Sequence, residues 1–372
     1  MASRDVRFVT KPLGPPWNDS GKNLPWSLAS RLTRHRARVW TPQGVTLPPF
    51  PSVVPEPLLA AAGRFRNPMA ANAEMLARLL APDPAVGLTH FFFTPTPLTA
   101  KVAGLVRRVK MRTPMVQNVN SLPRVPETLA RLVFGDRVVV LSRHAETVLR
   151  AAGLQDKVVR IAPFVPLLDP GVDAAVVERP GRPTFVYAGD LEFSRGGLLL
   201  TEAIPAVLRR VEADFVFACR AKTPRAGLIE RTIKLLLAAR HVPTERVQFV
   251  GEVADLPQRL AAATALVLPV DTLYAKMDLP LVALEALQLG TPCVLGDAPP
   301  LAELAEAGGS VQVQSRDAGL LVDVLVAMAT DRRRWLELSE AARVAWRTRY
   351  HPDVVVPAYE QLYDDLLAGR AP

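Results

Sequence analysis

The sequence contains few cysteines and no long apolar run. Its 372 residues include two cysteines, Cys219 and Cys293, and no Cys-x-x-Cys pair, so we expect neither a disulfide framework nor a cysteine-rich zinc site. No uninterrupted apolar stretch reaches the roughly 18 residues that a membrane-spanning helix needs, and the charged first residues are unlike a signal peptide. These absences predict a soluble, cytoplasmic protein.

Motifs of several enzyme and binding classes are also absent. The chain contains no Gly-x-Ser-x-Gly, no His-Glu-x-x-His and no Gly-x-x-x-x-Gly-Lys-Ser/Thr, which argues against the corresponding hydrolases, zinc proteases and phosphate-loop enzymes. Neither zinc-finger spacing nor an aromatic-basic RNA-binding motif is present. We therefore expect no nucleic-acid partner.

Positive charge is concentrated in the first half of the chain. There are 45 Lys and Arg against 36 Asp and Glu, and residues 1–165 carry more than the whole excess. The densest basic group surrounds the end of a helix expected at 98–109 and comprises Lys101, Arg107, Arg108, Lys110 and Arg112. Such cations stabilise a helix C-terminus, and they would also suit an anionic membrane surface, where each contributes about 1 kcal/mol. The second interpretation places the protein peripherally on the inner face of the plasma membrane.

What the chain does contain is a regular alternation of short apolar runs and helical patterns. A strand, a long polar loop, a helix and a second strand within residues 6–41 form the first unit of an α/β, doubly wound parallel sheet. The length predicts two domains, and the Pro- and Gly-rich stretch 166–183 is the expected linker between residues 1–165 and residues 184–350. Further strands are expected at 89–93, 115–119, 138–141, 158–162, 214–218, 247–250, 265–269 and 293–295.

One segment, residues 276–297, combines a helix with an unusual carboxylate. Its polar loop ends at Pro280, whose missing N–H suits the first turn of a helix, and Gly290 ends that helix. Glu285 lies among the leucines and alanines of the helix. Because an unpaired carboxylate is rarely buried, Glu285 is either a rim or salt-bridged residue or a ligand-binding group beyond the strands.

This segment resembles the signature of family four of the retaining glycosyltransferases, which have the two-domain GT-B fold. The family has two acidic residues eight positions apart, the second in a Leu-Glu-Ala run before Gly-Thr-Pro, as at residues 284–292. The resemblance implies two Rossmann-like domains facing a central cleft, with the last helix, 351–372, returning to the first. It also implies that Glu285 binds the nucleotide ribose and that Leu281 belongs to the same donor site.

The start of the second domain also resembles the family, in the run Gly-Asp-Leu-Glu-Phe-Ser-Arg-Gly at 189–196. The resemblance implies that Gly189, Arg195 and Gly196 contact the donor diphosphate, and Arg suits bidentate contacts with phosphate. Gly251, in a Phe-x-Gly run, matches a family glycine near the nucleotide base.

Two positions depart from the family's pattern. Asp190 stands where the family has a phosphate-binding Arg and would repel phosphate, and Met277 stands where the first acid is expected. We expect Asp278 to replace that acid at a sugar hydroxyl, and Lys276 to compensate for the missing cation. Asp190 and Glu192 could also be read as a metal-binding Asp-x-Asp. Because a helix N-terminus with an arginine can neutralise a diphosphate, we expect no metal and no cofactor.

The first domain is expected to bind the acceptor. The loop after its first strand holds Asn18, Asp19 and Lys22, which either line the cleft or form an ordinary surface loop. At His90 the resemblance implies a catalytic or acceptor-side histidine, although a lone histidine is more often structural. His144, which follows an expected helix cap at Ser142, is a weaker acceptor-side candidate.

The resemblance implies a hexosyltransferase-type enzyme that moves sugar from a nucleoside-diphosphate sugar to an unknown hydroxyl acceptor, with retention of configuration and without metal. The acceptor would be a glycan, a lipid-linked molecule or a small molecule. Stabilisation of the leaving diphosphate by Arg195 would be the principal catalytic effect. Two alternatives stay open: a sugar-nucleotide epimerase of the same fold, and a non-catalytic protein that binds sugar nucleotides or polyanions.

Overall fold

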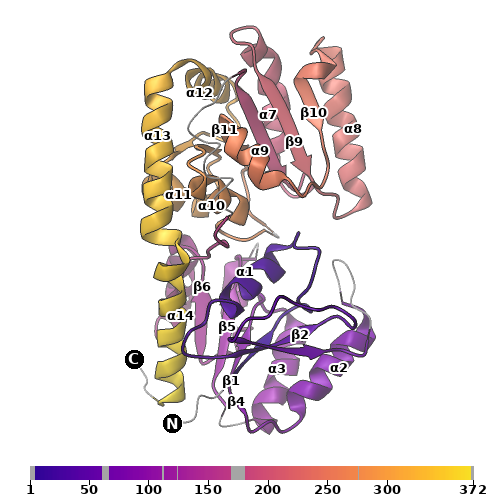
Figure 1. Ribbon diagram of the computed structural model, residues 1–372, viewed down its shortest axis with the longest axis vertical. Coiled ribbons are helices and arrows are strands. Elements are labelled where there is room, and N and C mark those ends of the chain that lie inside the picture. Colours follow the sequence, from indigo (N-terminus) through magenta and orange to yellow (C-terminus); the bar gives the residue numbers. More distant parts are fainter. Residues whose placement is uncertain are drawn as a thin grey trace. The chain divides into compact units, whose positions relative to one another are not determined.

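The computed structural model describes residues 5–60, 67–110, 113–123, 125–168, 181–274 and 276–369. The chain forms two compact units, Met1–Pro166 with His351–Pro372, and Leu167–Tyr350 (Figure 1). Each unit is a parallel sheet covered by helices, as predicted for a GT-B fold. Most of the predicted linker, 166–183, lies outside the described residues.

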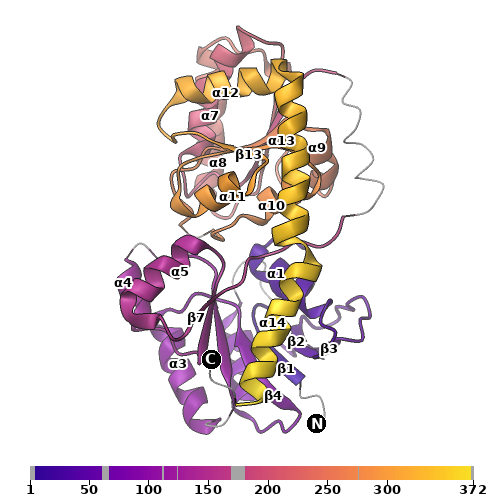
Figure 2. The ribbon, with the colours of Figure 1, turned by 90° about the vertical axis from the view of Figure 1, so that its left-hand side faces the viewer.

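The first unit contains a seven-stranded parallel sheet in the order β3-β2-β1-β4-β5-β6-β7. Figure 2 shows α3, α4 and α5 on one side of these strands and α1 and α14 on the other. The strands are β1 (Asp5–Val9), β2 (Ala37–Thr41), β3 (Val53–Pro57), β4 (Val86–Phe91), β5 (Met115–Val119), β6 (Arg137–Val140) and β7 (Val158–Arg160). The helices are α1 (Ser20–Ala29), α2 (Met69–Leu80), α3 (Pro97–Val109), α4 (Pro126–Ala130), α5 (Arg143–Leu149) and α14 (Pro352–Leu367).

Strand β3 was not predicted from the sequence. It lies at the edge of the sheet, where Pro55 pairs with Val39 of β2. A proline has no N–H for a second neighbour, so Pro55 and Pro57 are tolerated only because β3 pairs on one side. The continuous apolar run of strands such as β6 is interrupted here by Pro55, Glu56 and Pro57.

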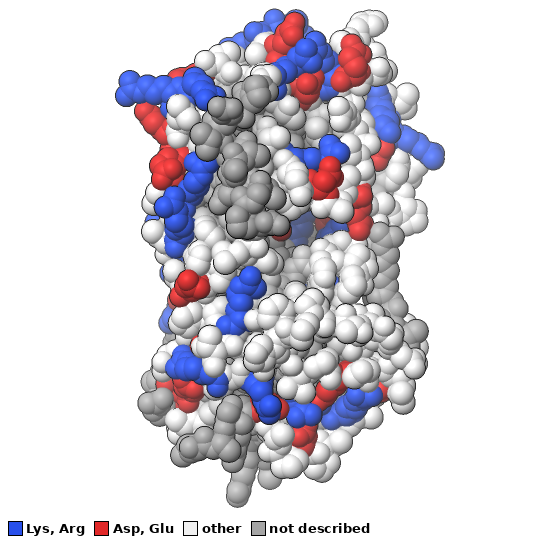
Figure 3. Space-filling view, viewed as in Figure 1, with Lys and Arg blue, Asp and Glu red and all other residues white. Residues whose placement is uncertain are grey.

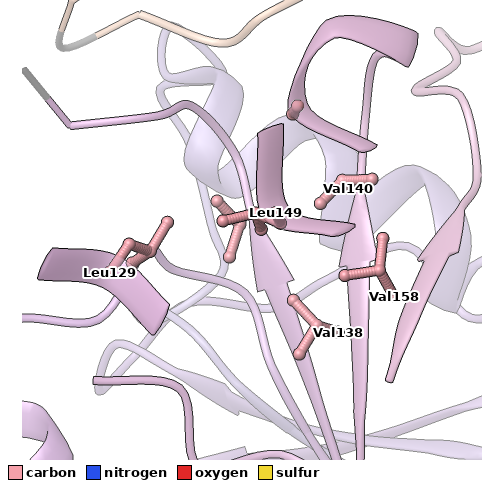
Figure 4. Close-up of a cluster of buried hydrophobic side chains, with 7 residues drawn as sticks. Leu129, Val138, Val140, Leu149 and Val158 are labelled. Carbon is pink, nitrogen blue, oxygen red and sulfur yellow. The ribbon is translucent and has the colours of Figure 1, made fainter. Parts of the chain in front are cut away.

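Valine and leucine side chains from strands and helices form the core of the first unit. Val138 and Val140 of β6 lie against Leu149 of α5, with Leu129 and Val158 beside them (Figure 4). A second cluster surrounds Trp40, Phe91 and Met115 under α2 and α3. The valines of β6 are fully buried, as expected for a strand inside a parallel sheet covered on both faces.

Some arginines of the first unit form internal ion pairs. Arg7, which is 3 % exposed, donates to Glu56 and to Asp83 at 3.2 and 2.6 Å. Arg38 pairs with Glu56 and with Asp5, at 2.6 and 3.1 Å. On the face drawn in Figure 3, basic and acidic side chains are interspersed within each unit. Arg7 and Arg38 therefore have a structural use, and their pairing leaves the net positive charge of the first half unchanged.

The C-terminal helix α14 is packed into the first unit by Glu360. Its carboxylate, 3 % exposed, accepts hydrogen bonds from the amides of Thr33 and Arg34, both at 2.6 Å. Tyr363 of the same helix contacts His90 of β4, with 2.7 Å between the hydroxyl oxygen and Nδ1. Residues from the end of the chain thus complete the core of the first unit.

The second unit contains a six-stranded parallel sheet in the order β10-β9-β8-β11-β12-β13. The strand order reverses between β8 and β11, and ligands of open α/β sheets bind beyond the carboxyl ends of strands at such a point. The strands are β8 (Thr184–Gly189), β9 (Asp214–Cys219), β10 (Val247–Phe249), β11 (Ala265–Leu268), β12 (Cys293–Leu295) and β13 (Ser310–Gln312). The helices are α7 (Gly196–Leu208), α8 (Pro224–Ala239), α9 (Leu256–Ala262), α10 (Leu281–Gln288), α11 (Ala302–Ala307), α12 (Ala318–Thr330) and α13 (Arg332–Ala345).

Helix α10 lies close to its predicted position. Pro280 is its N-cap, one residue outside the expected first turn, and Gly290 follows its end with a φ of 67°. A left-handed residue at this position is the common way for a helix to end, and glycine adopts it without steric cost. The predicted strand at 293–295 is β12.

Candidate functional site

The loop between β8 and α7 is the centre of the candidate site. Gly189 ends β8 with a φ of 135°, and space is open around the position that a Cβ would occupy. A Cβ on Gly196 would lie 2.8 Å from Cγ1 of Val270, so a glycine is needed where α7 begins. The exposed Arg195 precedes that helix, and its amide donates to Oδ1 of Asp271 at 3.2 Å. The loops after β8 and β11 are thereby joined.

Asp190 is neutralised by two cations from the end of the neighbouring strand β9. Its carboxylate, 3 % exposed, accepts a hydrogen bond from Nε of Arg220 at 3.0 Å and pairs with Nζ of Lys222 at 2.7 Å. Burial alone would raise the pKa of Asp190, but the two cations lower it below its ordinary value. Two cations thus face the single negative charge of Asp190, and its effect on phosphate binding stays a prediction.

Arg220 and Lys222 were missed by the sequence analysis. They follow strand β9 in the run Cys-Arg-Ala-Lys-Thr-Pro at 219–224, and two cations directly after a strand were the available signal. What the sequence does not contain is the pairing itself, because Asp190 and Arg220 are 30 positions apart.

Lys276 reaches the same loop from the segment before α10. Its Nζ lies 3.5 Å from the carbonyl oxygen of Asp190 and 3.4 Å from Oγ of Ser194. The pKa of Lys276 is lowered from its ordinary value, because burial outweighs the opposing effect of the negative charge of Asp190. Lys276 therefore lies beside the β8–α7 loop, and its role in place of the missing cation stays a prediction.

Glu285 of α10 is a partly buried carboxylate with no side-chain partner among the described residues. Within the described part of the chain it accepts no side-chain hydrogen bond and pairs with no cation. Burial raises its pKa to about 7. A carboxylate that is desolvated but unpaired is costly, so a hydrogen-bonding ligand at this position would relieve the cost.

Other predicted donor residues surround α10. Asp278 and Met277 are 2 % and 4 % exposed, and Leu281, the first residue of the helix, is 7 % exposed. Gly251 follows β10 with a φ of 67°. The segment from Lys276 to Leu281 thus lies inside the second unit, and the sugar-binding role of Asp278 stays a prediction.

The predicted acceptor-side residues of the first loop make structural contacts. Asp19 caps α1 by accepting from the amide of Gly21 at 2.8 Å, and Asn18 lies half-buried before it. Lys22, 7 % exposed, donates from Nζ to the carbonyl oxygens of Gly14 and Pro16, both at 2.8 Å. Two of its three protons are thus held by its own loop, and an acceptor-side role for these residues stays a prediction.

His90 is fully buried in the first unit. Its Nδ1 and Nε2 lie 2.7 and 2.8 Å from the Tyr363 hydroxyl and from Oδ1 of Asn118, and burial lowers its pKa to about 3. Both nitrogens are occupied and the ring is neutral near pH 7. This geometry gives His90 a packing role and does not support the expected catalytic one, because no face of the ring is open to an acceptor.

Helix α5 begins with the predicted cap. Oγ of Ser142 accepts from the amide of Ala145 at 3.0 Å, which confirms the cap. His144 is half-buried in the first turn of α5, where burial lowers its pKa, and its acceptor-side role stays a prediction.

Among the described residues, no three His, Cys, Asp or Glu side chains form a metal-binding group.

The second unit matches a known family model. Residues 182–331 match the model described as glycosyl transferases group 1. No curated protein matches the chain.

Solved structures of several glycosyltransferases and related proteins share the fold of the whole chain. Sucrose-phosphate synthase from Thermosynechococcus elongatus is 17% identical with a TM-score of 0.77, over 98% of this chain and 100% of that one. Anabaena Alr3699/HepE, in complex with UDP and glucose, is 14% identical with a TM-score of 0.73, over 97% and 99%. A UDP-forming alpha,alpha-trehalose-phosphate synthase from Burkholderia vietnamiensis is 12% identical with a TM-score of 0.72, over 100% and 98%. The chain therefore has the GT-B fold, and its residues 182–331 are similar to the glycosyl transferases group 1.

Proposed function

We propose that the protein is a glycosyltransferase that moves a hexose from a nucleoside-diphosphate sugar to a hydroxyl acceptor, with retention of configuration and without a metal ion. The observation that carries the proposal is the Glu285 carboxylate, which is desolvated and has no partner among the described residues. A ribose diol supplies two hydroxyl donors and would satisfy it. The family match of residues 182–331 supports the same assignment.

In this reaction the bond between the anomeric carbon and the diphosphate oxygen breaks, and the acceptor oxygen bonds to the same face of the sugar. The acceptor proton passes to the leaving diphosphate, so the protein's main task is to stabilise the developing negative charge. Arg195 and Lys276 lie at the loop after β8, where such charge would develop. Asp278 would hold a sugar hydroxyl.

A panel of UDP, GDP, dTDP and ADP tests the donor site by thermal shift in the presence of EDTA. The matching nucleotide, at about 100 times its dissociation constant, should stabilise the protein by roughly 2.7 kcal/mol. UDP is the first choice, because Alr3699/HepE is described in complex with UDP. A panel in which no nucleotide raises Tm would contradict the proposal.

Product analysis separates the transferase from its alternatives. A transferase with a sugar nucleotide and acceptor forms a glycoside, whereas an epimerase yields an isomeric or free sugar without an acceptor, and a binding protein yields no product. Formation of a glycoside with EDTA present is the expected outcome. A requirement for added Mg²⁺ or Mn²⁺ would contradict the metal-independent part of the proposal.

We also propose that the acceptor side works at an anionic membrane surface, to which helix α3 binds. Leu98, Leu105 and Val109 of α3 are 71%, 46% and 55% exposed, and the exposed Lys101 and Arg108 lie between them. The helix contains no acidic residue. A row of apolar and basic side chains on one helix face is typical of a helix that lies in a membrane interface. The described part of the chain contains no helix long and apolar enough to cross a bilayer.

The double variant Lys101→Glu/Arg108→Glu should bind vesicles of phosphatidylserine and phosphatidylcholine at least about tenfold more weakly than the wild type, because each cation near the surface contributes about 1 kcal/mol. Co-sedimentation measures the change. Lys157→Glu, an exposed charge reversal outside α3, is the control. Equal binding of the double variant and the wild type would refute the membrane proposal.

A further inference from the structure

Two cations, Arg220 and Lys222, follow β9 and contact Asp190 in the loop after β8. The family pattern has an arginine at the position of Asp190. The amide of Arg220 donates to the carbonyl oxygen of Gly189 at 3.2 Å, so Arg220 lies directly beside the end of β8. Arg220 and Lys222 bind opposite oxygens of the Asp190 carboxylate. With Lys276 nearby, three cations surround one buried acid at the carboxyl edge of the sheet.

Both cations keep unused hydrogen-bond donors. Arg220 donates to Asp190 through Nε, and its two terminal nitrogens make no hydrogen bond among the described residues and are not buried. Lys222 pairs with a single carboxylate oxygen, although an ammonium has three donors. A guanidinium with a free terminal pair is suited to bind two oxygens of one anion.

The loop that carries these cations is held in place by Glu192. Its Oε1 accepts hydrogen bonds from the amides of Lys222 and Thr223, at 3.1 and 2.9 Å. The ammonium of Lys222 also lies 5.6 Å from the centroid of the Phe193 ring. The loop after β9 is therefore fastened to the loop after β8 by both backbone and side-chain contacts, and the two cations are positioned before any ligand arrives.

We propose that Arg220 and Lys222, positioned by Asp190, bind the diphosphate of the donor and take over the role of the arginine that is absent at position 190. Asp190 then acts as a positioning residue: it orders two cations from the next strand and leaves a net positive charge at the end of β8. The inference rests on the proposed function, because it needs a nucleoside diphosphate as the ligand. The inference explains how an acid at position 190 is compatible with phosphate binding at the same loop.

Calorimetry of the wild type and of Lys222→Met and Arg220→Met, with UDP and with uridine in EDTA, tests the inference. Each variant should bind UDP at least about tenfold more weakly, while its affinity for uridine stays within about twofold, because the nucleoside lacks the diphosphate. Lys222→Arg keeps the charge and should retain most of the affinity. Arg210→Met, two residues beyond the C-terminal end of α7 and paired with Asp323, is the matched control. If UDP fails to bind the wild type, the nucleotide that raises Tm in the panel is used with its own nucleoside.

The outcomes separate the inference from the proposed function. If the wild type binds no nucleoside diphosphate, both fall. If the wild type binds one, and Lys222→Met and Arg220→Met bind it equally well, the inference falls and the proposed function stands. Loss of both UDP and uridine binding, with a lower Tm, would mean that the cations only support the fold, and this also overturns the inference. If Arg220→Met does not fold because it leaves Asp190 unpaired, the Lys222→Met and Lys222→Arg pair decides the question.

Discussion

Replacing Glu285 with Gln should weaken binding of a nucleoside-diphosphate sugar by at least tenfold and at the same time stabilise the ligand-free protein at pH 8. Gln keeps the shape but accepts fewer hydrogen bonds from a ribose diol than a carboxylate. The stabilisation has a separate cause, because the pKa of Glu285 is raised to about 7 by burial. The folded state therefore holds a proton that the unfolded state releases at lower pH, and stability falls as pH rises from about 4.5 to about 7.

The same pKa predicts the pH dependence of binding. If the ionised carboxylate is the binding form, affinity should fall about tenfold between pH 8 and pH 6, as the ionised fraction falls. UDP-glucose is the suitable probe, because both of its phosphates are esterified and carry no second proton in this range. Calorimetry should show a flat profile for Glu285→Gln. A wild-type profile equally flat, or a variant that binds normally, would mean that Glu285 does not contact the ligand.

Replacing Glu360 with Ala should destabilise the first unit by about 1.5–3 kcal/mol, because two partly buried amides of exposed residues would lose a charged acceptor, and a hydrogen bond to a charged group contributes about that much. These are the amides of Thr33 and Arg34, both 2.6 Å from Oε1 of Glu360. Glu360→Gln keeps one carbonyl acceptor and should lose less. Urea denaturation measures the change, and Glu337→Ala, which removes an exposed ion pair with Arg333, should cost less than about 1 kcal/mol.

Acid should weaken the same contact. Burial alone would raise the pKa of Glu360, but the hydrogen bonds from Thr33 and Arg34 lower it below its ordinary value. A carboxyl group with a lowered folded-state pKa contributes stability above its ordinary pKa and loses it as pH falls through the lowered one. The stability difference between the wild type and Glu360→Ala should therefore shrink in strong acid. A difference that stays constant down to pH 2 would contradict this role of the carboxylate.

Local patterns were sufficient to predict most of the fold. The strand expected at 115–119 is β5, and the helix that Gly290 ends is α10, because apolar runs and backbone-breaking residues act over a few positions. The same local rules missed the edge strand β3. Its two prolines argue against a strand, and they are tolerated because β3 pairs only with β2, on one side.

The candidate site divides in the same way between sequence and structure. Glu285 could be identified as a candidate site residue from the sequence alone, because an unpaired carboxylate is costly to bury wherever an apolar helix packs. The structure alone decided the meaning of Asp190, since its charge depends on Arg220 and Lys222, which only the pairing of β8 with β9 brings to it. It likewise decided the burial of His90, which α14 covers from the other end of the chain. Most helices and strands of this chain are set by neighbours in sequence, whereas the edge strand β3 and the charge and accessibility of buried side chains are set by neighbours in space.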